Sequence, residues 1–314
     1  MIPRVWSIYT SPHKYQGAFP PVKDGSTKIT KITAQAGYFL FKRKSMHKVE
    51  DPKYIKEEST RNIKLVIEYK GNMYYGFQMQ KDKKTVQGEL TKLLEELFNE
   101  KIYLIASGRT DKGVHALNQV VNFKINSNIE NFKIKKFLNR RLNKTDNKFL
   151  KVKEVEDVPL EFNSNLSAKS KKYMYILNYS YESGVYNDLE YTYVKDLDKE
   201  SMKKALDKFK GEKDFVAFCN RDNETKTTIR TVYDFTMEDI NGKLIFNISA
   251  NGFLNKMARI IIGTVLDVGL NKIDLNEIDD IFNSKDRKRA GRTIPAKGLY
   301  LVNVDYWGFD GKII

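Results

Sequence analysis

One short segment brings together side chains of the types that carry out covalent or acid–base chemistry. It spans residues 108–116 and reads GRTDKGVHA. The carboxylate of Asp111 has a guanidinium two residues before it and an ammonium directly after it, and these cations favour its ionised form. An ionised carboxylate can act as a nucleophile, a general base or a metal ligand. The two glycines also fit a simpler interpretation, an Asp-Lys-Gly turn in which Asp111 bonds its own backbone.

The elements around this segment predict where its carboxylate lies. Ile102, Leu104 and Ala106 alternate with other residues and end at Ser107, so we expect a short strand with Asp111 in the loop that follows it. Farther along the chain, Arg259 stands inside an apolar helix predicted over 253–268. An arginine in that position either faces an anionic partner or extends its head to solvent, and the spacing fits both.

The remaining hydrophobic pattern predicts an α+β chain in which strands are separated by helices, with neither a dinucleotide-binding glycine motif nor a P-loop. A polar, charged stretch over 139–157 predicts the link between two halves. We expect an N-terminal half with the Asp111 loop over 61–160 and a C-terminal half over 161–314. The predicted strands cover 63–69, 121–125, 171–177, 230–237, 244–249 and 298–302, and the predicted helices begin at Thr85, Asp198, Phe253 and Asp274.

Residues 1–60 form a segment without sustained helical or strand periodicity, rich in small polar residues and basic clusters. We expect an extension outside the domain. Two interpretations fit it: an upstream start that was assigned in error, with Met46 as an alternative initiator, or a basic arm that adds RNA contacts.

Composition limits the classes of function that fit the chain. The 314 residues carry a net charge of +15, which favours a polyanionic partner, nucleic acid before a membrane surface. No apolar run approaches the ~20 residues of a membrane helix, and residues 1–14 lack the features of a secretory signal, so we expect a cytoplasmic protein. The single cysteine, Cys219, has apolar neighbours that predict burial, and three scattered histidines predict no structural metal.

Segment 108–116 resembles the catalytic signature of the TruA family of tRNA pseudouridine synthases. Further segments similar to the family are 69–78, 85–90, 167–173, 251–264 and 286–306, so the resemblance runs from about residue 61 to about 307. The chain departs from the family pattern at Asn118, which replaces a glycine, at Asn165, which replaces an arginine, and at Arg292, where proline is common.

This resemblance implies a fold of two related α/β halves that share a mainly antiparallel sheet flanked by helices, with the active cleft between them. It implies a homodimer that isomerises uridine to pseudouridine at positions 38, 39 and 40 of the tRNA anticodon stem-loop. Because the reaction is an isomerisation, we expect no cofactor.

The resemblance also implies roles for individual residues. Asp111 would be the nucleophile, on C6 of the uracil or on C1′ of the ribose, and Arg259 would pair with it. Tyr173 would pack on the uracil and help to remove its C5 proton, and Arg109 would assist extrusion of the base.

Four other basic residues, Lys171, Lys172, Arg140 and Arg141, fit either phosphate contacts or solvated positions.

Three other functions remain to be weighed against this one. A paralogue that modifies a different RNA would keep the same chemistry. A catalytically silent RNA-binding protein would need none of Asp111, Tyr173 and Arg259 in register. A metal nuclease would need several convergent carboxylates, and the signature loop holds only one.

Overall fold

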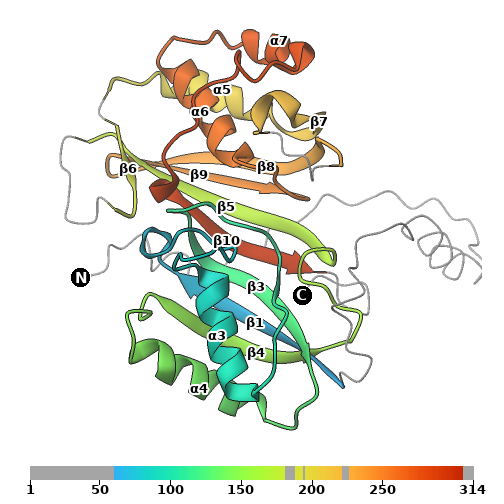
Figure 1. Ribbon diagram of the computed structural model, residues 1–314. Helices are drawn as coiled ribbons and strands as arrows, with labels where there is room; N and C mark the ends of the chain where they lie inside the picture. Colours follow the sequence, from blue (N-terminus) through green and yellow to red (C-terminus); the bar gives the residue numbers. More distant parts are fainter. Residues whose placement is uncertain (1–59, 181–187, 194, 221–225, 307–314) are drawn as a thin grey trace, which may run out of the picture. The chain divides into compact units, whose positions relative to one another are not determined.

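The computed structural model describes residues 60–180, 188–193, 195–220 and 226–306, which belong to one compact unit spanning 56–314. The predicted extension lies outside the described residues except for Thr60. The predicted α+β class is confirmed, since strands of a mixed, mainly antiparallel sheet carry helices along their flanks (Figure 1). The strands are β1 (Arg61–Tyr69), β2 (Ile105–Ala106), β3 (His115–Ile125), β4 (Leu150–Val158), β5 (Ala168–Asn178), β6 (Tyr191–Thr192), β7 (Gly211–Asp214), β8 (Ile229–Ile240), β9 (Lys243–Ala250) and β10 (Leu299–Tyr306).

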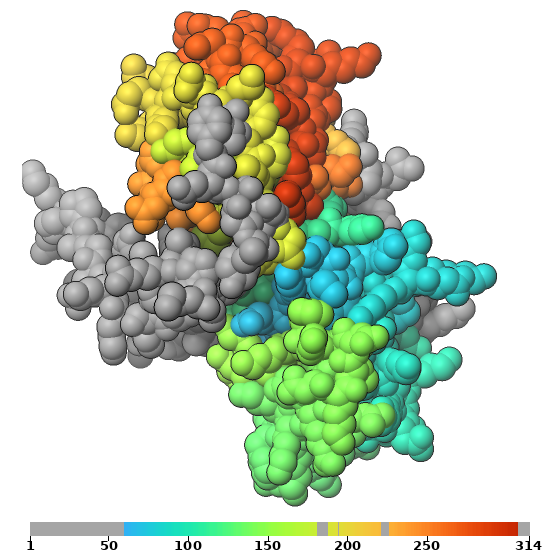
Figure 2. All heavy atoms as spheres, turned by 90° about the vertical axis from the view of Figure 1, so that its left-hand side faces the viewer, coloured from blue at the N-terminus to red at the C-terminus, as the bar shows by residue number. Residues whose placement is uncertain are grey.

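The α-helices of the described residues fall into two groups along the sheet. They are α3 (Val86–Phe98), α4 (Asn131–Asn143), α5 (Lys199–Asp207), α6 (Met257–Gly269) and α7 (Glu277–Ser284). Helices α3 and α4 accompany β1, β3 and β4, whereas α5, α6 and α7 accompany β8 and β9 (Figure 1). In the space-filling view, the green atoms of α4 and β4 and the orange and red atoms of α6 and α7 lie at opposite ends of the coloured surface (Figure 2). Each of these helices has at most 13 residues, and none has the length and apolar content to cross a bilayer.

The order of strands explains how distant segments come together. The sheet runs β4-β1-β3-β10-β5-β9-β8-β7, so the last strand in sequence lies between two much earlier ones. Strand β10 is antiparallel to β5 along most of its length but parallel to β3, where Tyr300 pairs with His115 and Leu301 with Ala116. Asn118 lengthens this short contact, because its Nδ2 donates to the Val302 carbonyl at 2.8 Å. The departure from the family pattern at Asn118 therefore provides a side-chain link between β3 and β10.

Local sequence accounts for the helix that follows the first turn. Thr85 precedes α3, and its Oγ1 accepts a hydrogen bond from the Gly88 N–H at 3.2 Å, as expected of an N-cap. Val86, Leu90 and Leu94 recur at helical spacing and are fully buried. Asn99 ends the helix in the left-handed conformation at φ 53°.

The predicted link over 139–157 is wrong, because this stretch is the end of α4 and most of strand β4. Helix α4 buries Ile134, Leu138 and Leu142, which lie four residues apart, but basic and polar residues surround them and mask the pattern. Strand β4 lies at the edge of the sheet and is largely solvated, so its sequence is polar although its backbone is paired with β1. Other predicted bounds also shift, since β2 has only two residues, β3 begins at His115 instead of residue 121, and α6 begins at Met257.

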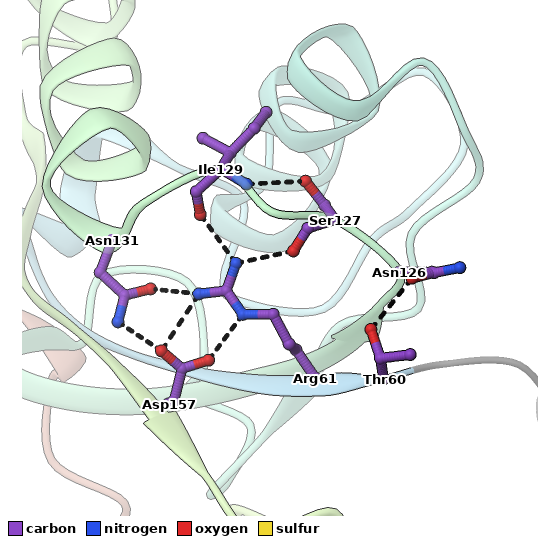
Figure 3. A network of polar contacts seen from close by, with 7 residues as sticks. All are labelled: Thr60, Arg61, Asn126, Ser127, Ile129, Asn131 and Asp157. Carbon is purple, nitrogen blue, oxygen red and sulfur yellow. Dashed lines mark hydrogen bonds and ion pairs between the residues drawn. The ribbon is translucent and has the colours of Figure 1, made fainter.

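A polar network fastens the edge strand to the rest of the sheet (Figure 3). Arg61 on β1 extends its guanidinium toward Asp157 on β4, with its Nε 2.7 Å from Asp157 Oδ1. The same guanidinium donates to the carbonyls of Ser127 and Ile129 at 2.8 and 2.7 Å and to Asn131 Oδ1 at 2.9 Å. It therefore joins two strands to the connection that leads into α4. Its hydrogen bond lowers the pKa of the Asp157 carboxyl.

We expect Arg61→Met to lower the free energy of unfolding by about 1–3 kcal/mol, because two partly buried carbonyls lose their donor. The matched change Lys64→Met, on the neighbouring pair with Glu156, should cost less than about 1 kcal/mol, because this pair has the same exposure but, among the described residues, the ammonium holds no backbone carbonyl. Because Asp157 has a lowered pKa in the folded protein, its contribution is present above the unfolded pKa near 4 and is lost as the pH falls through the folded value. Urea unfolding at pH 7 and pH 3 should therefore show a smaller Arg61 effect at pH 3, and an unchanged effect would contradict this account.

Candidate active site

The signature segment forms the loop between β2 and β3, and its backbone makes the turn that the sequence predicts. The Val114 N–H donates to the Asp111 carbonyl at 3.1 Å, which closes the Asp-Lys-Gly turn. The Thr110 carbonyl accepts from the Phe77 N–H at 3.0 Å, so the segment after β1 supports the loop from one side. The carboxylate of Asp111 takes no part in this turn and extends toward Arg259.

A layer of buried polar groups fixes the start of the loop. Tyr69 and Thr110 share a hydrogen bond of 2.8 Å between their hydroxyl groups. Gln119 donates from its Nε2 to the Gly108 carbonyl at 2.9 Å and accepts from the Ser107 hydroxyl. Each of these side chains is buried and hydrogen-bonded, so the start of the loop is held before any substrate binds. Neither Tyr69 nor Gln119 stands out in the sequence as a support of this loop.

His115 closes the other end of the loop as a buried, neutral ring. Its Nδ1 accepts from the Gly71 N–H at 3.1 Å and its Nε2 donates to the Lys297 carbonyl at 3.1 Å, while the ring stacks on Tyr300 at 4.6 Å. Burial lowers the pKa of His115 to about 4, so the imidazole stays uncharged at neutral pH. The only histidine of the loop is therefore a positioning residue that joins β3 to the segment before β10.

Arg259 and Asp111 come from opposite parts of the sequence and meet in the folded chain. The Nη1 of Arg259 lies 2.8 Å from Asp111 Oδ2, and its Nε donates to the Ile294 carbonyl at 2.8 Å. The arginine side chain is 14% exposed and the aspartate 39%, so the pair lies at the boundary between core and solvent. Among the described residues, Asp111 Oδ1 has no hydrogen-bond partner. One oxygen is thus held by a cation while the other is open to a reactant.

The segment after α7 keeps Arg259 in place by packing on helix α6. The Gly291 N–H donates to Thr264 Oγ1 at 3.0 Å. Arg292 pairs with Asp267 and lies over the Tyr193 ring at 5.1 Å. The departure at Arg292 therefore adds an ion pair to helix α6 in place of the rigidity of proline.

Tyr173 lies on β5, near the Asp111 carboxylate that pairs with Arg259. Its side chain is 8% exposed, and its ring contacts Phe253 edge-on at 4.9 Å between centroids. Burial, together with the nearby Tyr69 and Asp111, raises the pKa of the Tyr173 phenol, so the resting group is protonated. Phe253 lies ahead of α6 instead of inside a helix as the sequence predicts, which lets its ring face Tyr173.

The basic residues predicted to bind RNA differ in their contacts and in the faces on which they lie. The Lys171 ammonium donates a hydrogen bond to the Ser107 carbonyl, and its Nζ lies 3.4 Å from Asn165 Oδ1. Burial, together with the nearby Arg230, lowers the pKa of Lys171 to about 8. Lys172 follows it on the same strand and therefore points to the opposite face of the sheet. Arg109 is exposed at the start of the loop.

The two arginines of α4 lie away from the Asp111 loop. Helix α4 packs on the edge strand β4, and Arg141 pairs with Glu96 at 2.7 Å. The structure therefore brings Asp111, Arg259, Tyr173 and Lys171 together but not Lys172, Arg140 or Arg141. Among the described residues, no group of three His, Cys, Asp or Glu side chains could hold a metal ion.

Comparison with known proteins matches the chain to one family. The profile of a tRNA pseudouridine synthase family matches residues 65–165 and 205–307. The chain is 44% identical over 247 residues to tRNA pseudouridine synthase A of Caldicellulosiruptor bescii, a match that covers 78% of this chain and 100% of that protein. It is 43% identical, with the same coverage, to the protein of that name from Acetivibrio thermocellus. The chain belongs to the tRNA pseudouridine synthase family and is an isomerase.

The turn at Gly76 offers a test of how tightly the Asp111 loop is supported. A Cβ at Gly76 would lie 3.0 Å from the Thr110 carbonyl oxygen and 3.2 Å from the Lys112 nitrogen, with φ at +91°. Gly211 has nearly the same φ, +90°, but nothing within 4 Å of its Cβ position. Both Gly→Ala changes should therefore cost about 1–3 kcal/mol of folding free energy from backbone strain.

Only Gly76→Ala should also lower kcat, by about tenfold or more, because it displaces the loop that carries Asp111. Single-turnover pseudouridine formation, measured for both variants below their melting temperatures, checks this. Equal activity of the two would show that the loop tolerates displacement.

Proposed function

We propose that this chain converts uridine to pseudouridine at positions 38, 39 and 40 of the tRNA anticodon stem-loop, with Asp111 as the nucleophile. The observation that carries the proposal is the pairing of Asp111 Oδ2 with Arg259 at 2.8 Å while Oδ1 stays open. The resemblance of segment 108–116 to the TruA signature and the names of the relatives support the choice of RNA.

The reaction rearranges one nucleoside and needs no group donor and no redox partner. The bond from N1 to C1′ breaks, the uracil turns, and a bond from C5 to C1′ forms. The proton on C5 leaves and N1 gains one, so atoms and electrons balance within the substrate. The protein must therefore supply a nucleophile, a place for the turning base and a proton acceptor.

Asp111 supplies the nucleophile through its open oxygen, on C6 of the uracil or on C1′ of the ribose. A guanidinium that is itself anchored restrains a carboxylate in one orientation. Arg259 does so, because its Nε is anchored on the Ile294 carbonyl while its Nη1 contacts Asp111. It acts on the reaction through Asp111.

Tyr173 and Arg109 act on the base in this proposal. Extruding a uridine from the stacked loop costs a few kcal/mol, and the exposed Arg109 at the start of the Asp111 loop takes the place that the base leaves. The ring of Tyr173, backed edge-on by Phe253, packs on the extruded uracil, and its oxygen, after the phenol has lost its own proton to solvent, accepts the C5 proton. Lys171 holds the loop through the Ser107 carbonyl.

The state of the enzyme in the cell is part of the same proposal. We expect a homodimer, as the family resemblance implies, and we expect it in the cytoplasm. Light scattering on the purified full chain checks the oligomeric state.

Asp111→Asn should abolish pseudouridine formation, with a loss of about a thousandfold or more in single-turnover rate, because the amide is a poor nucleophile of the same shape. The measurement is carbodiimide adduct mapping by primer extension on an unmodified tRNA transcript. The control is Asp280→Asn, a carboxylate exposed on α7, which should keep full activity.

Stops at positions 38 to 40 that vanish only in Asp111→Asn support the proposal. Stops at other positions would show that the enzyme modifies a different RNA site. RNA binding without any stop would contradict the enzymatic activity and favour a catalytically silent RNA-binding protein.

Tyr173→Phe should lower kcat by about 100-fold while RNA affinity stays close to that of the wild type, because the stacking ring remains and the proton acceptor is lost. Because burial raises the pKa of the phenol, Tyr173 is still mostly protonated between pH 7 and pH 9, and its ionised fraction increases across this range. The wild-type single-turnover rate should therefore rise between pH 7 and pH 9. That dependence should disappear in the variant. A variant with full activity would assign the proton to another acceptor.

A further inference from the structure

A second surface feature adjoins the Asp111 loop, on the segment that follows β1. Tyr75 lies here with 46% of its side chain exposed, and Met79 nearby is 52% exposed. The Tyr75 backbone N–H donates to the Lys84 carbonyl at 2.8 Å, so the ring stands on an anchored turn. An exposed, well-positioned aromatic ring is a common surface for stacking nucleobases.

Two lysines lie on this ring. The Nζ of Lys112 is 4.2 Å from the Tyr75 ring centroid, and the Nζ of Lys83 is 5.1 Å from it. Within the part of the chain that the structure describes, neither ammonium is in an ion pair. By contrast, Lys133 lies 5.7 Å from the Phe132 ring but is paired with Glu130 at 2.6 Å. The Tyr75 cluster therefore keeps two positive charges without a carboxylate.

This cluster is joined to the reacting carboxylate through the backbone. Lys112 directly follows Asp111 in the sequence. Gly76, next to Tyr75, packs so closely on the loop that its Cβ position is 3.5 Å from the Asp111 carbonyl carbon. A molecule bound on Tyr75 would therefore be a near neighbour of a base bound at Asp111.

We propose that Tyr75, Lys83 and Lys112 bind one unpaired nucleotide of the RNA substrate next to the target uridine. This inference rests on the proposed function. The nucleobase stacks on the Tyr75 ring, and the two ammonium groups leave the ring for the flanking phosphate. A cation–π contact at an exposed ring is weak, and a phosphate is a stronger partner for a lysine.

The chemistry of this nucleotide site matches a substrate with several target positions. Stacking on an aromatic ring tolerates any base, because every base has a π-face. Lysine recognises phosphate as a point charge without reading sequence. A site of this kind accepts whichever nucleotide adjoins the target, so one protein can modify successive positions with different neighbours.

The test compares Tyr75→Leu, which removes the ring, with Tyr75→Phe, which keeps it. The probe is a fluorescent, unmodified tRNA transcript titrated with full-length protein. Tyr75→Leu should raise Kd about tenfold, whereas Tyr75→Phe stays within about twofold of the wild type. Single-turnover kcat at saturating RNA should stay within about threefold for both variants, and their melting temperatures should match.

The lysines are tested by the salt dependence of Kd. Lys83→Gln and Lys112→Gln should each lower the slope of log Kd against log salt by about 1, as expected for the loss of one phosphate contact. The matched controls Phe132→Leu and Lys133→Gln remove a similar ring and cation on α4 and should change neither Kd nor slope.

An unchanged Kd in Tyr75→Leu overturns the nucleotide site. A lower kcat or melting temperature with unchanged Kd also overturns it, since the ring would then only support the Asp111 loop. If the wild type binds the transcript but forms no pseudouridine, the proposed reaction fails, while the comparison of Leu and Phe at residue 75 still decides the nucleotide site.

Discussion

The ion pair between Arg259 and Asp111 is the interaction on which the arrangement of the site depends. A charged arginine inside an apolar helix is costly to bury unless a carboxylate and a carbonyl take up its hydrogen bonds, and Asp111 and Ile294 do so. The same contact fixes the carboxylate, whose loop is tied to β3 by the hydrogen bond from Gln119 to the Gly108 carbonyl. Stability and reactivity therefore meet in one pair: removing either partner leaves the other charge partly buried without compensation.

The pairing of Asp111 with Arg259 was predicted from the family resemblance, because the local pattern around each residue also fits a structural role. Asp111 lies between glycines and cations, and Arg259 is a charged residue in an otherwise apolar helix. Both can therefore be selected as candidates from the sequence alone. The residues that support them were not predictable in this way. Tyr69, Gln119 and Tyr300 read as ordinary strand residues, and only the pairing of strands far apart in sequence shows that they surround the loop. The contact of Phe253 with Tyr173 was likewise not predictable, because it depends on where α6 begins.

The α+β class followed from alternating strand and helix patterns, and the main error was the supposed link over 139–157. Periodicity reports burial, so an element buried along a narrow stripe or at a sheet edge gives a weak signal. Helix α4 buries one residue in each turn, and β4 has a neighbour on one side only. The place of β10 was also hidden, because hydrophobic alternation specifies a strand but not its neighbours.

The position of β10 bears on the order in which the protein forms during synthesis. Strands β4, β1 and β3 can pair once residue 158 has left the ribosome, and β5, β9 and β8 once residue 250 has left it, but within the sheet both sets pair with β10 and no strand of one set pairs with a strand of the other. Both Asp111 and Arg259 therefore exist in the nascent chain well before residues 299–306 leave the ribosome and join the sets. The strand made last among those described is therefore the one that joins, within the sheet, the part that carries Asp111 to the part that carries Arg259.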